Sequence, residues 1–248
     1  MVDGFGAVGK TTMLKSFISR FFDPKTFLTI GVDFFSKEYS LFGRKVIATF
    51  WDFSGADRFN FLRPILYKGA SSMILVCDLT RPRTLEGIDY FLDIASRESQ
   101  INPKQVILVG NKTDLFGERS VTREYIESIL QEHQLFKLIE TSANSFENLD
   151  IIFELAIGIA MCVKGLIGNS EFNSFKEDLE QRIVIPAHEI EDYELRQCWS
   201  CKKSLDFNGF KIINASLPKD KLIQLWESPY LQFFCCSCYK DIRNHKMS

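Results

Sequence analysis

Hydrophobic and polar positions in the first 165 residues follow two alternating periods. Short apolar runs, typical of strands, are separated by stretches with the period of an amphipathic helix. The strand-like runs are Phe34–Leu41, Lys45–Asp52, Met73–Asp78, Val106–Gly110 and Leu138–Glu140, of which the first two are joined across Gly43 as a predicted hairpin. The helical stretches are Lys10–Phe21, Arg83–Ser99, Thr122–His133 and Leu149–Val163. Strands that alternate with helices predict an α/β fold with a largely parallel sheet covered on both faces.

The first strand of this pattern is short. Only Met1, Val2 and Asp3 precede the first glycine-rich motif, and aspartate is a poor strand residue. We expect either that the natural chain begins before Met1 or that the first strand is truncated, and we favour the former.

Charge and cysteine distribution divide the rest of the chain. Eight acidic residues lie between Glu171 and Glu194, opposed only by Lys176 and Arg182, whereas the segment from Arg196 onward carries a modest excess of Lys and Arg. We therefore predict a first domain at residues 1–165, an acidic linker or helix at 166–195 and a cysteine-rich module at 196–248. The net charge of −2 gives no strong signal for nucleic acid. With no signal peptide and no membrane-spanning apolar run, we expect a cytoplasmic protein whose membrane association, if any, is peripheral and through partners.

Residues 4–11 read GFGAVGKT and fit the pattern G-x-x-x-x-G-K-[ST]. Glycines let the backbone wrap so that successive N–H groups point at phosphate oxygens, and the helix that follows adds its positive dipole end. Lys10 would supply charge to the terminal phosphates, and the Thr11 hydroxyl would bind Mg²⁺. Nucleotide contacts are expected from Gly4, Gly6, Ala7, Val8, Gly9, Lys10, Thr11 and Thr12.

Three further motifs each follow a predicted strand, where ligands bind in such sheets. Asp52 to Gly55 match D-x-x-G, in which the carboxylate holds Mg²⁺ and the Gly55 N–H meets a γ-phosphate. Residues 111–114 match N-K-x-D, and the Asp114 carboxylate can accept two hydrogen bonds from guanine but would face an acceptor on adenine. Residues 141–144 read TSAN, where a backbone N–H can donate to guanine O6. The expected contacts are Asn111, Lys112, Asp114, Ser142, Ala143 and Asn144.

These four motifs, together with the T-I-G-V-D-F run from Thr29 to Phe34, resemble the Ras superfamily and most closely its Rab branch. The resemblance covers about residues 4–165. It implies the P-loop small-GTPase fold, with a mostly parallel six-stranded sheet, and a Mg²⁺-dependent GTP/GDP switch of the kind used in vesicle trafficking. Thr29 would close on Mg²⁺ beside Thr11 and Asp52, and Lys10, Thr29 and Gly55 would act in catalysis.

The resemblance also implies partners and one further nucleotide contact. Two mobile switch regions are implied, Gly31–Phe34 and the segment after Gly55. Effectors, exchange factors and activating proteins would bind them, with contacts to Trp51 and to Leu66, the last in place of a usual aromatic. Phe22 corresponds by position to an aromatic beside the guanine, and the alternative is an ordinary hydrophobic residue at a helix end.

Ala56 departs from the family pattern, because small GTPases usually place Gln directly after D-x-x-G to orient the attacking water. Alanine cannot hydrogen-bond a water, and Asp57 is one residue too far along. We therefore predict slow intrinsic hydrolysis, with assisted turnover still open to activators that supply Arg and Gln in trans. The alternative is a GTP-binding scaffold that barely hydrolyses its nucleotide and works as an interaction platform.

The C-terminal module contains two C-x₂-C pairs, whose ligands would be Cys198, Cys201, Cys235 and Cys238. Paired thiolates at this spacing can converge on one structural Zn²⁺, which would stabilise a segment too small for a sufficient core. Cys236 could replace Cys235, and His245 is a weaker alternative ligand. The cysteine cluster also resembles prenylated Rab ends, but the chain ends without a prenylation signal. A zinc module that binds nucleic acid remains a third, weaker reading.

Overall fold

The computed structural model describes residues 1–19 and 29–184, together with 196–198, 200, 204–205 and single positions between 221 and 233. The chain divides into two compact units, Met1–Val184 and Ile185–Ser248. In the second unit, strands β7 (Arg196–Gln197) and β8 (Ser204–Leu205) pair in antiparallel fashion. All other elements named below belong to the first unit.

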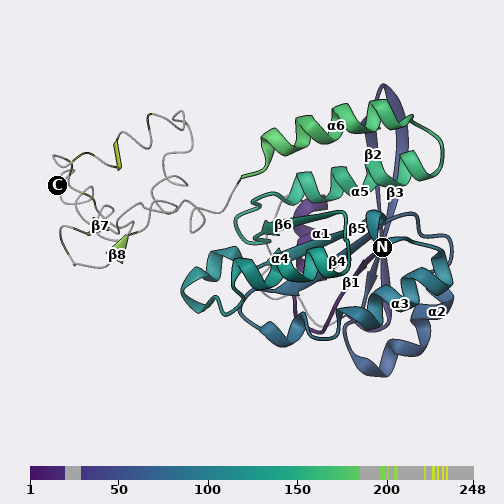
Figure 1. The fold of residues 1–248 in the computed structure, drawn as a ribbon, viewed down its shortest axis with the longest axis horizontal. Helices are drawn as coiled ribbons and strands as arrows, with labels where there is room; N and C mark the ends of the chain where they lie inside the picture. The colour runs from purple at the N-terminus through teal and green to yellow at the C-terminus, as the bar shows by residue number, and fades with distance from the viewer. Residues whose placement is uncertain are drawn as a thin grey trace. The chain divides into compact units, whose positions relative to one another are not determined.

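A six-stranded sheet forms the centre of the first unit, as the sequence predicts (Figure 1). Its strands are β1 (Val2–Asp3), β2 (Val32–Leu41), β3 (Arg44–Phe53), β4 (Met73–Asp78), β5 (Val106–Asn111) and β6 (Lys137–Thr141). They lie in the order β2-β3-β1-β4-β5-β6, and only β2 runs antiparallel to its neighbour. The β2–β3 hairpin turns at Phe42 and Gly43, whose φ values of 54° and 68° are those of a tight turn suited to the strand twist.

Helices cover both faces of this sheet (Figure 1). They are α1 (Lys10–Ser19), α2 (Arg63–Leu66), α3 (Ile88–Ser99), α4 (Arg123–Glu132), α5 (Leu149–Val163) and α6 (Asn169–Arg182). Short 3₁₀ segments are η1 (Asp57–Leu62), η2 (Pro82–Thr84), η3 (Pro103–Gln105) and η4 (Thr113–Glu118).

Alternate residues of the central strands build two separate hydrophobic cores. On β4, Ile74 and Val76 pack with residues of α1 and α5, whereas Leu75 and Cys77 face residues of α3 and α4. This follows from the two-residue period of a strand, and it explains why β4 and β5 are apolar at almost every position. The buried sheet therefore holds the loops at its carboxyl ends in fixed places.

The predicted helix at Arg83–Ser99 is wrong in its first turn, since α3 begins only at Ile88. The side chain of Thr84 explains the difference. Its hydroxyl accepts from the Asp78 N–H at 3.0 Å and donates to the Arg81 carbonyl at 2.7 Å. These bonds compete with helical ones and favour the short 3₁₀ turn η2.

Helix α6 packs alongside α5, and the first compact unit extends through it to Val184 rather than ending near residue 165. Ion pairs from Glu180 to Lys137 (2.8 Å) and from Arg182 to Glu154 (3.0 Å) hold its C-terminal half. The apolar side of this acidic helix covers part of α5, most of whose residues are buried.

Helix α6 packs tightly against α5 at Gly158. A Cβ there would lie 2.8 Å from a ring carbon of Phe175 and 3.2 Å from one of Phe172. We expect Gly158→Ala to lower the free energy of unfolding by about 1 kcal/mol, because overpacking outweighs the gain in helix propensity. Denaturant unfolding would measure the change. Gly117→Ala is the control, since a Cβ there meets no atom within 4 Å; a Gly158→Ala protein more stable than wild type would contradict this packing.

No helix in the described part of the chain combines the length and the apolar character needed to span a bilayer.

Candidate functional site

The loop between β1 and α1 approaches its neighbours so closely that glycine is required. Gly4 has φ 140°, and a Cβ there would lie 2.2 Å from the Val76 carbonyl oxygen. At Gly9 (φ 99°) a Cβ would lie 2.3 Å from Nδ2 of Asn111, which donates to the Val8 carbonyl at 2.8 Å. The N-K-x-D loop therefore supports the glycine-rich loop directly.

Lys10 lies across the same loop. Its Nζ donates to the carbonyls of Gly4 at 2.8 Å and Phe5 at 2.7 Å. Burial lowers the pKa of Lys10 to about 8, while the charges of Asp3 and Asp52 oppose that shift. The ammonium is thus placed inside the loop whose backbone would surround phosphate oxygens.

Three oxygen-bearing side chains predicted to bind Mg²⁺ converge beside the loop. The Thr11 hydroxyl lies 2.5 Å from Oδ2 of Asp52 and 2.6 Å from the Thr29 hydroxyl, which lies 3.4 Å from the same Oδ2. The other carboxylate oxygen of Asp52 is buried without a hydrogen-bond partner among the described residues. Burial raises the pKa of Asp52 to about 6, against the hydrogen bond from Thr11 and the charge of Lys10. Mg²⁺ prefers hard oxygen ligands. The two hydroxyls and the buried Asp52 carboxylate are ligands of this kind, so the three side chains suit Mg²⁺.

Gly55, at the end of D-x-x-G, packs against the glycine-rich loop, because a Cβ there would lie 2.3 Å from the nitrogen of Gly6. The next residue, Ala56, donates its N–H to the Ser54 hydroxyl at 3.3 Å and offers only a methyl group. The structure therefore brings Gly55 to the predicted phosphate position without a side-chain donor beside it at Ala56.

The two predicted guanine loops meet through Asp114. Its carboxylate accepts from the Ser142 hydroxyl at 2.6 Å and from Nδ2 of Asn144 at 3.3 Å. The Ala143 N–H donates to Oδ1 of Asn111 at 3.4 Å. Hydrogen bonds thus join the loops that follow β5 and β6. Asp114 is exposed, so a nucleotide base could reach its carboxylate.

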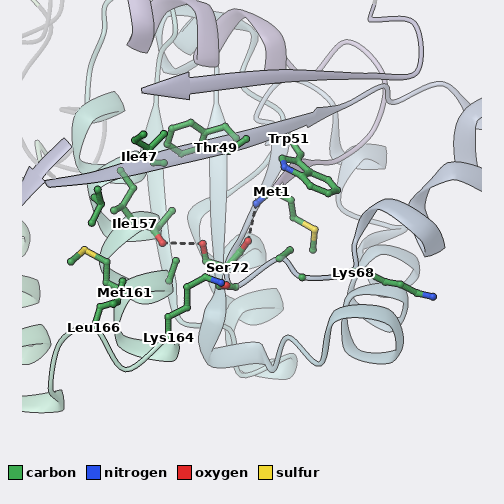
Figure 2. A pocket seen from close by; sticks show the side chains of 18 residues that line it. Met1, Ile47, Thr49, Trp51, Lys68, Ser72, Ile157, Met161, Lys164 and Leu166 are labelled. Carbon is green, nitrogen blue, oxygen red and sulfur yellow. Dashed lines mark hydrogen bonds between the residues drawn. The ribbon is translucent and has the colours of Figure 1, made fainter. Parts of the chain in front are cut away.

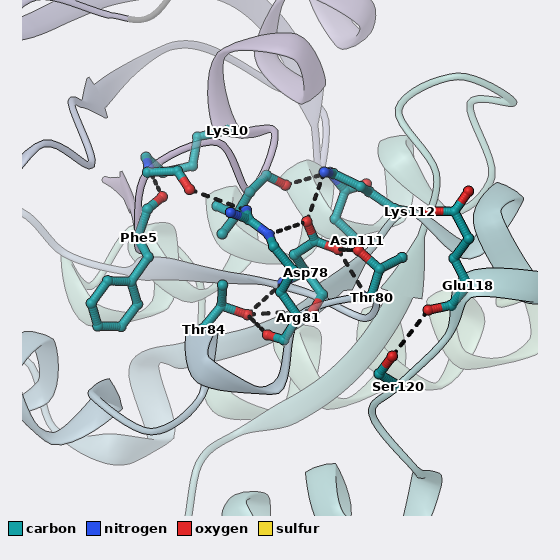
Figure 3. A network of polar contacts seen from close by, with 12 residues as sticks. Phe5, Lys10, Asp78, Thr80, Arg81, Thr84, Asn111, Lys112, Glu118 and Ser120 are labelled. Atoms are coloured by element: carbon teal, nitrogen blue, oxygen red, sulfur yellow. Dashed lines mark hydrogen bonds and ion pairs between the residues drawn. The ribbon is translucent and has the colours of Figure 1, made fainter.

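One group of site residues was missed from sequence. Asp78, at the end of β4, accepts from Nζ of Lys112 at 2.7 Å and from Nε of Arg81 at 2.8 Å, and Arg81 also donates to the Gly6 carbonyl at 3.1 Å (Figure 3). Burial alone would raise the pKa of Asp78, but hydrogen bonds from Lys112, Thr80 and Arg81 hold it below its usual value. Asp78 thereby ties the N-K-x-D loop to the glycine-rich loop. Its position after an apolar strand is the only sequence signal for it.

The predicted partner surface contains apolar side chains that are exposed to different degrees. Phe34 is 57% exposed and packs edge-to-face on Trp51 with ring centroids 5.2 Å apart. Leu66 is half-buried, and Phe61 and Ile65 nearby along the chain are exposed.

Several predicted residues lie outside the described part of the chain, namely Phe22, Cys201, Cys235, Cys236, Cys238 and His245. Cys198 is described and is buried. Among the described residues no three His, Cys, Asp or Glu side chains form a metal-binding group. The zinc site therefore stays a prediction.

A cavity of about 430 Å³ lies between β3 and α5, at the amino ends of β1 and β4 (Figure 2). Ser72 lies at its wall, where its carbonyl accepts from the Met1 amine and its hydroxyl donates to the Ala156 carbonyl, both at 2.9 Å. The loops described above end the strands on the opposite edge, so this cavity is separate from the candidate nucleotide site.

A model of the Ras family matches residues 1–161 of this chain. The chain is 32% identical over 203 residues to the Ras-related protein RABA5c of Arabidopsis thaliana, which covers 81% of this chain and 92% of that protein. Identity to the Ras-related protein Rab-19 is 31% for the Mus musculus protein and 30% for the Rattus norvegicus one, over 178 residues that make up 72% of this chain and 79% of each relative. The stretch matched by the family model contains all four motif loops.

Proposed function

This chain belongs to the Ras family as a Rab-like small GTPase, and we propose that it binds GTP and GDP with Mg²⁺ and hydrolyses GTP slowly. The observation that carries the proposal is the convergence of four loops, from β1, β3, β5 and β6, at one edge of the sheet. Contacts within this edge, from Asn111 to the Val8 carbonyl and from Thr11 to Asp52, preorganise it before any nucleotide arrives.

Different residues of the chain would bind the phosphates, the base and the metal ion. Lys10 and the backbone N–H groups of residues 4–11 would bind the phosphates, and the Gly55 N–H would orient the terminal one. Asp114 would accept from the guanine N1–H and exocyclic amine, which selects guanine over adenine. Thr11, Thr29 and Asp52 would hold Mg²⁺, which when bound neutralises charge on the β- and γ-phosphate oxygens.

Native mass spectrometry of the purified full chain tests the proposal. We expect one equivalent of GTP or GDP per chain and one Mg²⁺, with no adenine nucleotide. If the chain purifies without bound nucleotide and also fails to bind a fluorescent GDP derivative, the proposal is wrong.

Slow hydrolysis follows from Ala56, whose methyl group cannot orient water. We expect Ala56→Gln to raise the single-turnover rate of GTP hydrolysis by about tenfold while leaving GTP affinity nearly unchanged, since glutamine would position the attacking water. The rate of a Ras-family protein that carries Gln at this position, measured side by side, gives the comparison. A wild-type rate equal to that of a relative carrying Gln at this position would refute slow hydrolysis.

A second candidate function is a GTP-bound platform with almost no turnover, and the methyl group of Ala56, which cannot orient a water, favours it. The two readings differ in one measurement. A platform keeps GTP bound over many hours even with an activating protein present, whereas a cycling switch converts it to GDP. In either case, effectors, exchange factors and activating proteins would bind the switch regions.

We also propose that residues 196–248 hold a structural Zn²⁺ through Cys198, Cys201, Cys235 and Cys238. The supporting observation is that β7 and β8 pair and that Cys198, directly after β7, is buried. We expect Cys201→Ser to lose the bound zinc, measured as metal per chain by mass spectrometry. Cys162→Ser on α5 is the control and should retain it. If the wild-type protein contains no zinc, the proposed zinc site is wrong.

A further inference from the structure

Arg63 and Asp3 form a buried ion pair between the start of α2 and the end of β1. The guanidinium Nε lies 2.7 Å from Oδ2 of Asp3 and Nη2 lies 2.9 Å from Oδ1, with side chains 2% and 0% exposed. The Tyr67 hydroxyl donates to the same carboxylate at 2.5 Å. Burying such charges costs stability that apolar residues would not cost, so packing alone does not account for the pair.

The carboxylate of Asp3 also contacts the glycine-rich loop. Its Oδ1 accepts from the Gly4 N–H at 2.7 Å, at the first residue of that loop. One side chain therefore binds the phosphate loop on one side and the segment after D-x-x-G on the other.

Arg63 makes a third contact, to the backbone of D-x-x-G itself. Its Nη2 donates to the Ser54 carbonyl at 3.0 Å. That carbonyl belongs to the same peptide unit as the Gly55 N–H, and in a trans peptide the two point in opposite directions. Because the Ser54 carbonyl points towards Arg63, the Gly55 N–H points away from Arg63. Gly55 itself packs against Gly6 of the glycine-rich loop.

Aromatic and polar groups fix Arg63 in this position. The guanidinium carbon lies 5.1 Å from the ring centroid of Phe91 on α3, and Nη1 donates to the Asn60 side chain. Arg63 thus connects β1, η1, α3 and the D-x-x-G segment through contacts that belong entirely to the protein.

We propose that Arg63 is a positioning residue that holds the Ser54–Gly55 peptide, and with it residues 54–67, in the orientation that presents the Gly55 N–H to a γ-phosphate, whichever nucleotide is bound. A segment held only by the γ-phosphate is released after hydrolysis. Here the holding contacts remain when GDP replaces GTP, so the nucleotide-dependent change is confined to residues near Thr29. This inference rests on the proposed GTP and GDP binding.

Hydrogen exchange of the full chain tests it, with Mg²⁺ and either GDP or a non-hydrolysable GTP analogue. In the wild type, amides of residues 54–67 should show protection equal within about twofold in the two states. In Arg63→Met, protection should fall by about tenfold or more with GDP and less with the analogue, whose γ-phosphate contributes its own contact. Arg97→Met, an exposed arginine on α3 paired with Asp93, is the matched control and should change neither.

Two milder variants guard against misfolding of Arg63→Met. Tyr67→Phe removes one hydroxyl. Arg63→Lys keeps the charge, but a lysine lacks the forked guanidinium that reaches both Asp3 and the Ser54 carbonyl. Both variants should lose less protection than Arg63→Met, and again more with GDP than with the analogue. A tenfold difference between nucleotide states in the wild type, or equal losses in both states for the Arg63 variants, would overturn the inference alone. A wild-type chain that binds neither nucleotide would overturn the proposed function and this inference with it.

Discussion

Lys10→Met is expected to lower the affinity for GTP and for GDP by about a hundredfold or more. Lys10 is 5% exposed and its ammonium donates to the Gly4 and Phe5 carbonyls, so it is placed to meet phosphate charge away from water. Losing one partner of a desolvated, hydrogen-bonded charge pair typically costs about 2–5 kcal/mol, and each 1.4 kcal/mol corresponds to about tenfold in affinity. Methionine keeps the length and the apolar stem of the side chain, so the packing of α1 changes little.

Titration with a fluorescent GDP derivative measures this loss, and competition with GTP extends it to the triphosphate. Lys15→Met, further along the same helix and outside the four motifs, removes the same charge and should bind as the wild type does. If Lys10→Met bound GDP within about threefold of the control, the phosphate site would have to lie elsewhere.

Asp114→Asn is expected to weaken GTP binding by about a hundredfold or more and to create binding of xanthosine triphosphate. The carboxylate would accept two charge-assisted hydrogen bonds from guanine, each worth about 1.5–3 kcal/mol. An asparagine amide can accept only one of them, but its NH₂ can donate to the C2 carbonyl of xanthine. In this chain the Asp114 carboxylate is held by the Ser142 hydroxyl and the Asn144 amide, so its replacement should keep its place at the edge of the site.

Competition between GTP and xanthosine triphosphate for the labelled nucleotide site measures this change in specificity. Asp93→Asn on the surface of α3 has the same chemistry outside the site and should leave the preference for guanine intact. Loss of GTP binding without any gain for xanthosine triphosphate would show that Asp114 acts through loop structure rather than through the base.

Most of the sheet could be predicted because local pattern decides it. The run at Met73–Asp78 is apolar at almost every position, and β4 has those bounds. The turn at Gly43 needs a positive φ, which glycine adopts readily, so the β2–β3 hairpin could be read from sequence. In contrast, the start of α3 depends on hydrogen bonds of the Thr84 hydroxyl with backbone groups on either side of it, and helical periodicity does not reveal such competition.

Helix α6 shows a different limit. Its acidic composition suggests a solvated linker or helix, yet its apolar positions pack on α5. That contact depends on Gly158, in a helix that precedes it, where the missing side chain makes room for Phe172 and Phe175. The space for an aromatic ring exists only where the two helices pack together, so the sequence of neither helix alone reveals it.

By itself, the sequence determined the order of the elements and the four motif loops, because glycine conformations, strand periodicity and the chemistry of Lys10, Asp52 and Asp114 are local properties. Tertiary structure alone decided that Asp3 pairs with Arg63 and that Asp78 joins Lys112 to Arg81. Asp3 is visible in sequence only as a charged residue in a strand where an apolar one is expected. Its partner lies 60 positions away, and a buried charge selects its partner by proximity in space, which only the folded sheet and its helices provide.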